Sequence, residues 1–438
     1  MSDHPFAPGS VPFVDLGDAF PPVLVVDPAM DVLHDRVLEY VASLKAVELV
    51  EFPGQEHAFF VMELCGEASD ELVMRHTLAH CQQHLSNIIY TTMSSTTSPA
   101  SGVSGELPPP THVVEDCLGF LQLLSDGTVK RAPAPLVLHN ADDDTSAVRW
   151  KDVVYDETHN LSVRMYVPSS AIAGDETKLP VLVYFHGGGF CIGSFANPGF
   201  HAATLRLAAE LPAVVLAADY RLAPEHRLPA ALHDADTLFS WLRSQATLTG
   251  SGDPWLATAA DFTNVFVSGD SAGANIAHHL AVRVGSGSLA AAPVRVAGCV
   301  LLWPYFGGEE RTASETNCPS DVFLTLPLYD QMWRLALPAT ASRDHPVANP
   351  FGPESPDLSS VELPPVLVAV GGRDMLVDRI REYVARLNAM GNKSVELAEF
   401  EGKGHGFSIF EPDSEAAAEL VRVVLRRFVH GGAAAAAS

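Results

Sequence analysis

Six short apolar runs in the C-terminal three quarters of the chain constrain its fold more than any other feature. Longer stretches with helical periodicity separate them, such as residues 236–243, 275–284 and 379–390. Most of the runs are continuously apolar, which is typical of parallel strands covered on both faces. Strands that alternate with helices predict an α/β fold around a mostly parallel sheet. The predicted strands are 181–185, 213–220, 264–270, 296–304, 364–372 and 395–402.

The composition fits a chain with a large buried core and an acidic surface. Of the 438 residues 47% are hydrophobic, and 27 Lys and Arg oppose 53 Asp and Glu, for a net charge of −26. Such a surface repels nucleic acid and anionic lipid, so we expect neither as a partner. The opening MSDHPFAPGS lacks the pattern of a secretory signal, and six scattered cysteines form no CxxC pair. These features predict a cytoplasmic protein, and they leave its oligomeric state open.

An internal repeat links the start of the chain to its C-terminal part. Residues 21–46 align without gaps on 364–389 with 15 of 26 positions identical, and residues 47–61 align on 395–409 with 8 of 15 identical. The alignment pairs Asp31 with Asp374 and His57 with His405. A repeat that occurs only twice excludes a solenoid.

The repeat and the composition predict three regions. Residues 1–75 form a partial duplicate, the Ser/Thr/Gly/Pro-rich stretch 76–110 is a flexible linker, and residues 111–438 form the main domain. Three origins or roles remain open for the duplicate: a vestigial gene fusion, a mis-joined gene, or a segment that docks on the main sheet or exchanges between subunits.

The strongest chemical signal is GDSAG, residues 269–273, between a predicted strand and a helical pattern. A G-x-S-x-G sequence in this context places Ser271 on a sharp strand-to-helix turn, where flanking glycines avoid clashes. The hydroxyl then projects above the carboxyl edge of the sheet. We therefore expect Ser271 to be a nucleophile.

A second signal is HGGGF, residues 186–190, directly after another predicted strand. Successive glycines allow backbone amides to approach a ligand closely, as acyl transfer requires where the oxyanion forms. The predicted oxyanion hole comprises Gly187, Gly188 and Gly189 with the amide of Ala272. His186 is expected to fix this loop rather than to act as a base.

A serine nucleophile needs a hydrogen-bonded base that a carboxylate orients. Asp374 and His405 each follow a predicted strand at the same sheet edge as Ser271, so they are the predicted partners. Asp378 is the rival carboxylate, but it lies within a helical pattern. His278 and His279 follow Ser271 on a helix and are expected to be packing or surface residues.

Several motifs together resemble the plant carboxylesterases of the hormone-sensitive-lipase branch of the α/β-hydrolases. They are HGGGF, YRLAPEHRLPAALHDA, GDSAGANIAHH, DHPVANPF and GGRDMLVD with GKGHGF, and the similarity spans about residues 112–430. The resemblance implies an eight-stranded, mostly parallel sheet with a helical cap, built from about 111–135 and 306–349. It also implies a Ser271–His405–Asp374 triad that hydrolyses short-chain or aromatic carboxylic esters, with no metal or other cofactor.

Two relatives of this family supply the alternatives. Gibberellin receptors share the fold but lack the triad histidine, whereas His405 is present here. Hydroxyisoflavanone dehydratases have threonine in the oxyanion loop, whereas this loop has only glycine. An esterase is thus expected first, a lyase or transesterase second and a non-catalytic receptor third. Apolar cap residues are expected to line the substrate pocket or to pack in the core: Phe306, Phe323, Tyr329, Met332 and Trp333.

Overall fold

The structure is a computed structural model that describes residues 23–28, 47–52, 111–137, 147–173, 178–248 and 251–435. The chain divides into two compact units, residues 1–106 and residues 107–438. The predicted linker and most of the predicted duplicate lie outside the described residues.

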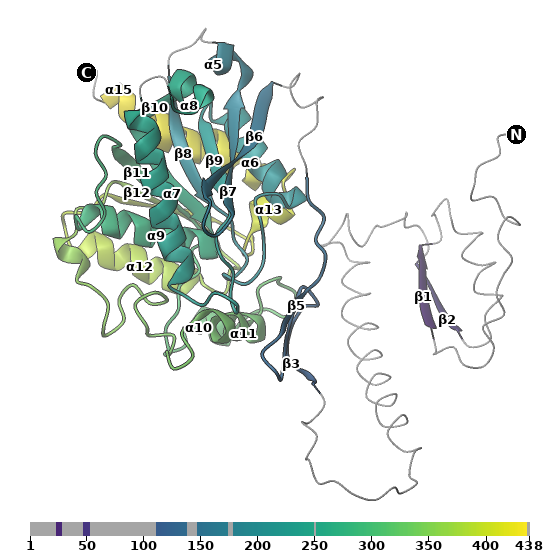
Figure 1. Ribbon diagram of the computed structural model, residues 1–438. Coiled ribbons are helices and arrows are strands. Elements are labelled where there is room, and N and C mark those ends of the chain that lie inside the picture. The colour runs from purple at the N-terminus through teal and green to yellow at the C-terminus, as the bar shows by residue number, and fades with distance from the viewer. Residues whose placement is uncertain are drawn as a thin grey trace, which may run out of the picture. The chain divides into compact units, whose positions relative to one another are not determined.

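Eight strands of the second unit form one sheet in the order β13-β12-β11-β10-β8-β9-β7-β6 (Figure 1). The strands from β13 to β9 pair in parallel, whereas β7 runs antiparallel to both β9 and β6. The predicted α/β fold with a mostly parallel eight-stranded sheet is confirmed. The strands are β6 Val148–Asp156, β7 Leu161–Pro168, β8 Leu179–Phe185, β9 Val214–Ala218, β10 Ala260–Asp270, β11 Val296–Leu302, β12 Val366–Gly371 and β13 Val395–Phe400.

Helices cover both faces of this sheet, because the side chains of its central strands alternate between two apolar cores. In β8, Val181 and Val183 join the core beneath α7, α9 and α12. Leu182 and Tyr184 join the core beneath α6 and the C-terminal helices, on the opposite face (Figure 1). The helices are α5 Ser169–Ala173, α6 Pro198–Glu210, α7 Ala230–Thr247, α8 Pro254–Ala259, α9 Ala272–Gly285, α12 Val377–Ala389, α13 Phe407–Phe410, α14 Glu415–Glu419 and α15 Arg426–Ala435, with a 3-10 turn η4 Leu358–Ser360 and a π-helix η5 Leu420–Leu425.

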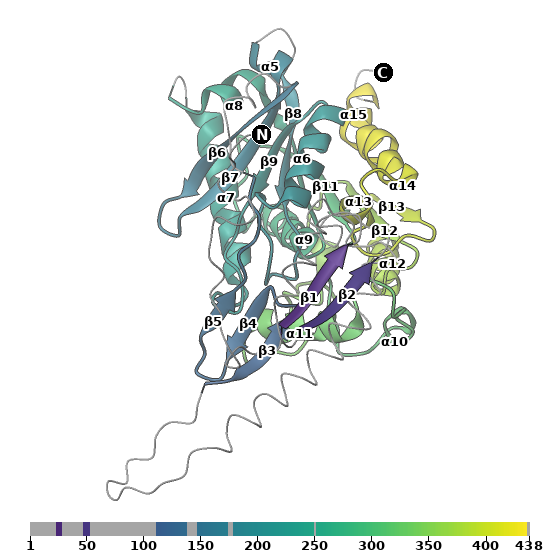
Figure 2. The same cartoon turned by 90° about the vertical axis from the view of Figure 1, so that its right-hand side faces the viewer.

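The expected helical cap is helical only in its second segment, which contains α10 Ala313–Thr316 and α11 Leu326–Ala336. The first segment instead forms a three-stranded antiparallel sheet of β3 Val113–Cys117, β4 Leu121–Leu124 and β5 Val129–Arg131 (Figure 2). A tight turn at Leu118 and Gly119, with φ of 51° and 72°, reverses the chain between β3 and β4. The two segments are joined where Gln331 and Arg334 of α11 donate hydrogen bonds to the carboxylate of Glu115.

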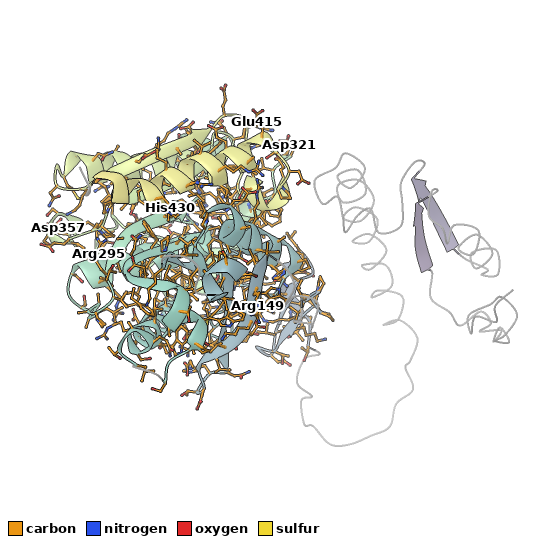
Figure 3. All side chains as sticks on the ribbon, turned by 90° about the horizontal axis from the view of Figure 1, so that it is seen from above. Arg149, Arg295, Asp321, Asp357, Glu415 and His430 are labelled. Carbon is orange, nitrogen blue, oxygen red and sulfur yellow. The ribbon has the colours of Figure 1, made fainter. Side chains whose placement is uncertain are left out.

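Charged side chains lie at the outside of this unit, among them the exposed Asp321, Asp357 and Glu415 (Figure 3). No helix among the described residues is long and apolar enough to cross a membrane.

The described part of the first unit is a two-stranded parallel sheet of β1 Val23–Pro28 and β2 Val47–Phe52. Its register runs from Val23 opposite Val47 to Pro28 opposite Phe52. The aligned strands β12 and β13 pair from Val366 opposite Val395 to Gly371 opposite Phe400. The repeated strands therefore pair in the same register in both units. Asp31 and His57 lie outside the described residues.

Candidate active site

Ser271 occupies a strained turn between β10 and α9. Its φ and ψ are 52° and −117°, a backbone conformation that non-glycine residues rarely adopt. The turn is tight enough that a Cβ at Gly273 would lie 1.9 Å from the carbonyl oxygen of Phe185. The amide of Ser271 donates to the carbonyl of Leu302, which fixes the turn against the end of β11. This geometry matches the predicted nucleophile turn.

His405 and Asp374 meet Ser271 at the carboxyl edge of the sheet. The Nε2 atom of His405 lies 2.8 Å from Ser271 Oγ, and its Nδ1 atom lies 2.7 Å from Asp374 Oδ2. The other carboxylate oxygen of Asp374 accepts a 2.9 Å hydrogen bond from the amide of Leu376. Ser271 and His405 are only 7% and 8% exposed, so most water is excluded from the reacting groups. An imidazole held between a hydroxyl and a carboxylate can move a proton to and from that hydroxyl.

The glycine loop follows β8 and lies against the serine turn. A Cβ on Gly187 would approach Cβ of Ser271 to 3.2 Å. The amide of Gly187 donates to Asp270 Oδ1 at 2.9 Å, so it is committed to that carboxylate and does not fit the predicted oxyanion role. Gly188 and Gly189 have φ of 115° and 58°, which favours glycine. Their amides and that of Ala272 remain the candidate donors.

The residues set aside by sequence reasoning have other partners. Asp378 accepts a hydrogen bond from the amide of Ser314 in the cap. His278 is buried with its Nδ1 atom 2.9 Å from the hydroxyl of Tyr383, and His279 contacts the carbonyl of Val347. His186 contacts the carbonyl of Gly187 and stacks on Tyr220, and burial lowers its pKa to about 4. The structure thus keeps these four side chains away from Ser271 Oγ.

The cap residues divide between core and surface. Phe306, Tyr329 and Trp333 are buried, and Trp333 stacks on Tyr305 with ring centroids 4.6 Å apart. Met332 packs against the glycine loop, because a Cβ at Gly189 would meet its sulfur. Phe323 is 44% exposed, and its ring lies 4.7 Å from that of Phe410, five residues after His405. Four of the five residues therefore pack in the interior.

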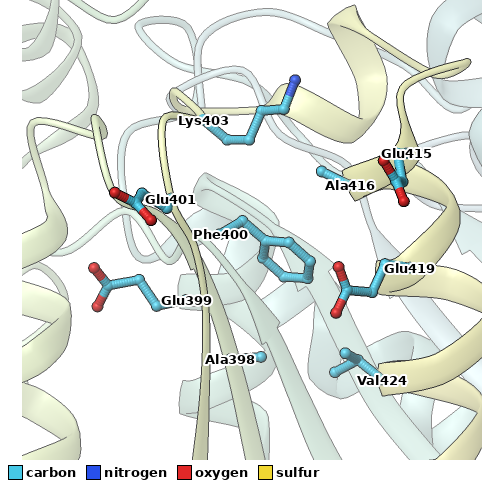
Figure 4. A pocket seen from close by; sticks show the side chains of 9 residues that line it. All are labelled: Ala398, Glu399, Phe400, Glu401, Lys403, Glu415, Ala416, Glu419 and Val424. Atoms are coloured by element: carbon cyan, nitrogen blue, oxygen red, sulfur yellow. The ribbon is translucent and has the colours of Figure 1, made fainter.

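A separate pocket of about 550 Å³ lies between β13 and α14 (Figure 4). Neither Ser271 nor its neighbours His405 and Asp374 line this pocket. Two of its glutamates, Glu415 and Glu419, project from the helical side, and Lys403 lies near its rim (Figure 4). Within the described ranges, no group of three or more His, Cys, Asp or Glu is placed to hold a metal ion.

Asp270 is the residue of this site that the sequence pattern did not single out. It is the first of the two variable positions of the G-x-S-x-G motif, and it lies buried between the serine turn and the glycine loop. An acidic residue next to the nucleophile within an otherwise apolar segment was the available signal.

Comparison with known proteins places this geometry in a family. The model of the α/β hydrolase fold matches residues 182–409, and that of the carboxylesterase family matches residues 127–224. The chain belongs to the α/β-hydrolase fold family.

Three plant relatives cover most of the second unit. Tuliposide A-converting enzyme 1 of Tulipa gesneriana, named as chloroplastic, is 36% identical over 72% of this chain and 78% of its own. A 2-hydroxyisoflavanone dehydratase of Glycyrrhiza echinata is 35% identical over 75% of this chain and 97% of its own. Probable carboxylesterase 2 of Arabidopsis thaliana is 33% identical over 70% of this chain and 93% of its own.

A solved esterase of Pyrobaculum calidifontis matches with a TM-score of 0.55 and 30% identity, over 65% of this chain and 85% of its own. Together with the plant relatives, it confirms both the expected resemblance to plant carboxylesterases and the expected enzyme class, a carboxylic ester hydrolase.

The expected cytoplasmic location is wrong on the same comparisons. Two matched enzymes of Tulipa gesneriana are named as chloroplastic and another as amyloplastic. The features behind that expectation were scattered cysteines and an N-terminus without a secretory pattern. Both separate intracellular from secreted proteins, but neither separates cytosol from the interior of a plastid.

Proposed function

We propose that the protein is a serine carboxylesterase in which Ser271, His405 and Asp374 form the catalytic triad. The observation that carries the proposal is the continuous hydrogen-bonded series from Ser271 Oγ through His405 to Asp374. The substrate class is a small uncharged ester with a short or aromatic acyl group. The glycine-rich loop and the buried cap residues around it support this class.

The proposed reaction runs through an acyl-enzyme. His405 takes the proton from Ser271 Oγ as the oxygen attacks the ester carbonyl, and Asp374 holds the imidazole in the required tautomer. The amides of Gly188, Gly189 and Ala272 stabilise the oxyanion, at about 10²–10³ in rate for each donor. His405 then gives the proton to the leaving alcohol. Water repeats the sequence on the acyl-enzyme and releases the acid.

The direct test is the Ser271→Ala variant. Removal of the nucleophile should lower kcat for p-nitrophenyl acetate by about 10⁴-fold or more, because the rest of the triad cannot act without it. Labelling of the folded wild-type protein by an organophosphonate, mapped to Ser271 by mass spectrometry, should accompany the loss. A variant with most of its activity, or a wild-type protein that takes no label, would refute the triad and would favour a binding protein.

A lyase or acyl-transferring variant of this chemistry is the second candidate. The dehydratase relative, which aligns over 97% of its own length, favours it. Product analysis separates these reactions. An esterase releases an acid and an alcohol in equal amounts, an acyl-transferring enzyme releases the alcohol and forms a new ester, and a dehydrating lyase releases water from an intact carbon skeleton.

The plastid enzymes among the relatives support a plastid location for this protein. A fluorescent protein fused to the C-terminus of the full chain should appear inside plastids of plant cells. Fluorescence confined to the cytosol would contradict this location.

A further inference from the structure

The side chain of Asp270 connects the two backbone segments that the proposed reaction must hold together. It extends from the end of β10, one residue before Ser271, and is only 3% exposed. Its Oδ1 atom accepts hydrogen bonds from the amide of Gly187 at 2.9 Å and from the hydroxyl of Tyr184 at 2.7 Å. Both donors belong to the end of β8 and the glycine loop that follows it.

The contact between Asp270 and Gly187 leaves the glycine loop little room to move relative to the serine turn. A Cβ at Gly187 would lie 2.3 Å from Asp270 Oδ2, so the loop backbone rests directly on the carboxylate. Gly188 follows at once, and its amide is a candidate oxyanion donor. A shift of Gly187 away from Asp270 would therefore move that donor relative to Ser271 Oγ.

A carboxylate at this position is costly, which argues for a role beyond packing. No lysine or arginine pairs with Asp270 in the part of the chain that the structure describes. The groups that act on it are Tyr184 on β8, Tyr220 after β9, the indole of Trp303 after β11 and His405 after β13. Burial raises the pKa of Asp270 to about 6, although the Tyr184 hydrogen bond and the charge of His405 act to lower it.

We propose that Asp270 is a positioning residue, which ties the glycine loop to the serine turn through its Oδ1 atom and so sets the oxyanion donors at their distance from Ser271. The inference rests on the proposed esterase function and extends it to a residue that touches no reacting atom. Its effect is confined to the transition state, because the oxyanion forms only there.

The test compares three variants in the full-length protein with p-nitrophenyl acetate. Asp270→Asn keeps an acceptor oxygen for Gly187, so its kcat should stay within about threefold of wild type at pH 8. Asp270→Ala removes the acceptor and should lower kcat about 10- to 100-fold with KM nearly unchanged, as expected for a displaced donor. Asp270→Ser, whose hydroxyl is too short to reach Gly187, carries the same prediction if the alanine variant does not fold.

The division of the loss between kcat and KM adds a readout that a purely structural role would not move. A loss confined to kcat reports an interaction made in the transition state, whereas a purely structural defect lowers the fraction of active molecules, which organophosphonate titration measures. Asp234→Asn is the matched control, because Asp234 is also buried but pairs with Arg221. It should lower the melting temperature and leave kcat unchanged.

Three results would overturn the proposal. They are an asparagine variant as impaired as the alanine variant, a loss that appears in KM alone, and a control with the same kcat loss. Organophosphonate labelling of Ser271 is measured in parallel. If wild-type Ser271 takes no label, the esterase function itself fails, whereas a labelled enzyme with normal Asp270 variants refutes only the positioning role.

Discussion

At the scale of single residues, the internal repeat allows the residues around His405 to be compared with the aligned residues of the first unit. Asp31 and His57 align with Asp374 and His405, and Gly54 aligns with Gly402, but the two glycines that flank His405 are not repeated. Gly371 is replaced by Pro28, and a Cβ at Gly371 would lie 2.2 Å from the carbonyl oxygen of Lys403. Gly406 has φ of 76°, where the repeat has Ala58. The backbone that presents His405 is therefore specific to the second unit.

This difference predicts opposite outcomes for two matched substitutions. His405→Ala should lower kcat/KM for p-nitrophenyl acetate by about 10⁴-fold or more, because Ser271 loses its base. His57→Ala should leave kcat/KM within about twofold of wild type, because the repeat contains no G-x-S-x-G serine. Residual activity in His405→Ala that disappears when His57 is also replaced would contradict this division of roles.

The sequence indicates that Ser271, Asp374 and His405 lie close together, because each follows a parallel strand and parallel strands end at one edge of a sheet. Sequence reasoning placed Gly187 among the oxyanion donors because three adjacent glycines look equivalent in a sequence. Whether the amide of Gly187 is free to bind a substrate depends on where the side chain of Asp270 lies, 83 positions further along the chain. A contact of that range has no local signature.

At the scale of elements, most of the strands that were predicted are buried on both faces, such as β8 and β12. The apolar runs at 181–185 and 264–270 fall on β8 and β10, whereas the run at 395–402 falls on β13, an edge strand whose residues are mostly half-exposed or exposed. The strands β6 and β7 were not predicted. β6 is an edge strand whose residues alternate between buried and more exposed positions, and β7 is largely buried but has the polar Ser162 and Arg164 within its run. The strands β3 to β5 were missed because each is short and half exposed, so neither its length nor its pattern stands out.

The packing of α9 against α12 predicts an acid-sensitive stability. His278 on α9 is buried, and burial lowers its pKa well below its usual value, with the neighbouring His279 acting in the same direction. Burial also holds the pKa of Tyr383 on α12 well above its usual value, so the tyrosine hydroxyl donates to a neutral imidazole. Below pH 6.5 the unfolded chain takes up a proton at this histidine before the folded protein does, so stability falls as the pH falls.

The measurement is the free energy of unfolding by urea at pH 7.5 and at pH 5 for wild type and His278→Asn. Asparagine keeps an acceptor for Tyr383 but does not titrate, so the variant should lose less stability between the two pH values. Equal losses in both proteins would show that His278 does not contribute to the acid sensitivity.

At the scale of the whole molecule, all parts of the proposed enzyme belong to one unit. The eight-stranded sheet, both of its apolar cores and Ser271, His405 and Asp374 lie within residues 107–438. The strands β1 and β2 pair with each other in a separate two-stranded sheet and supply no strand to the main one. The described strands of the main sheet therefore pair only with one another.

Because the sheet, its cores and the three site residues all lie within residues 107–438, we predict that this segment forms an active enzyme without the first unit. When expressed alone, the segment should hydrolyse p-nitrophenyl acetate with kcat/KM within about twofold of the full chain. Its melting temperature should stay within about 4 °C, a shift that corresponds to roughly 3 kcal/mol for a segment of this length. Calorimetry of both proteins gives the temperatures, and organophosphonate titration gives the fraction of active molecules. A segment that is insoluble, or that takes no label, would show that residues 1–106 complete the fold, and the repeat would then be a structural part of the enzyme.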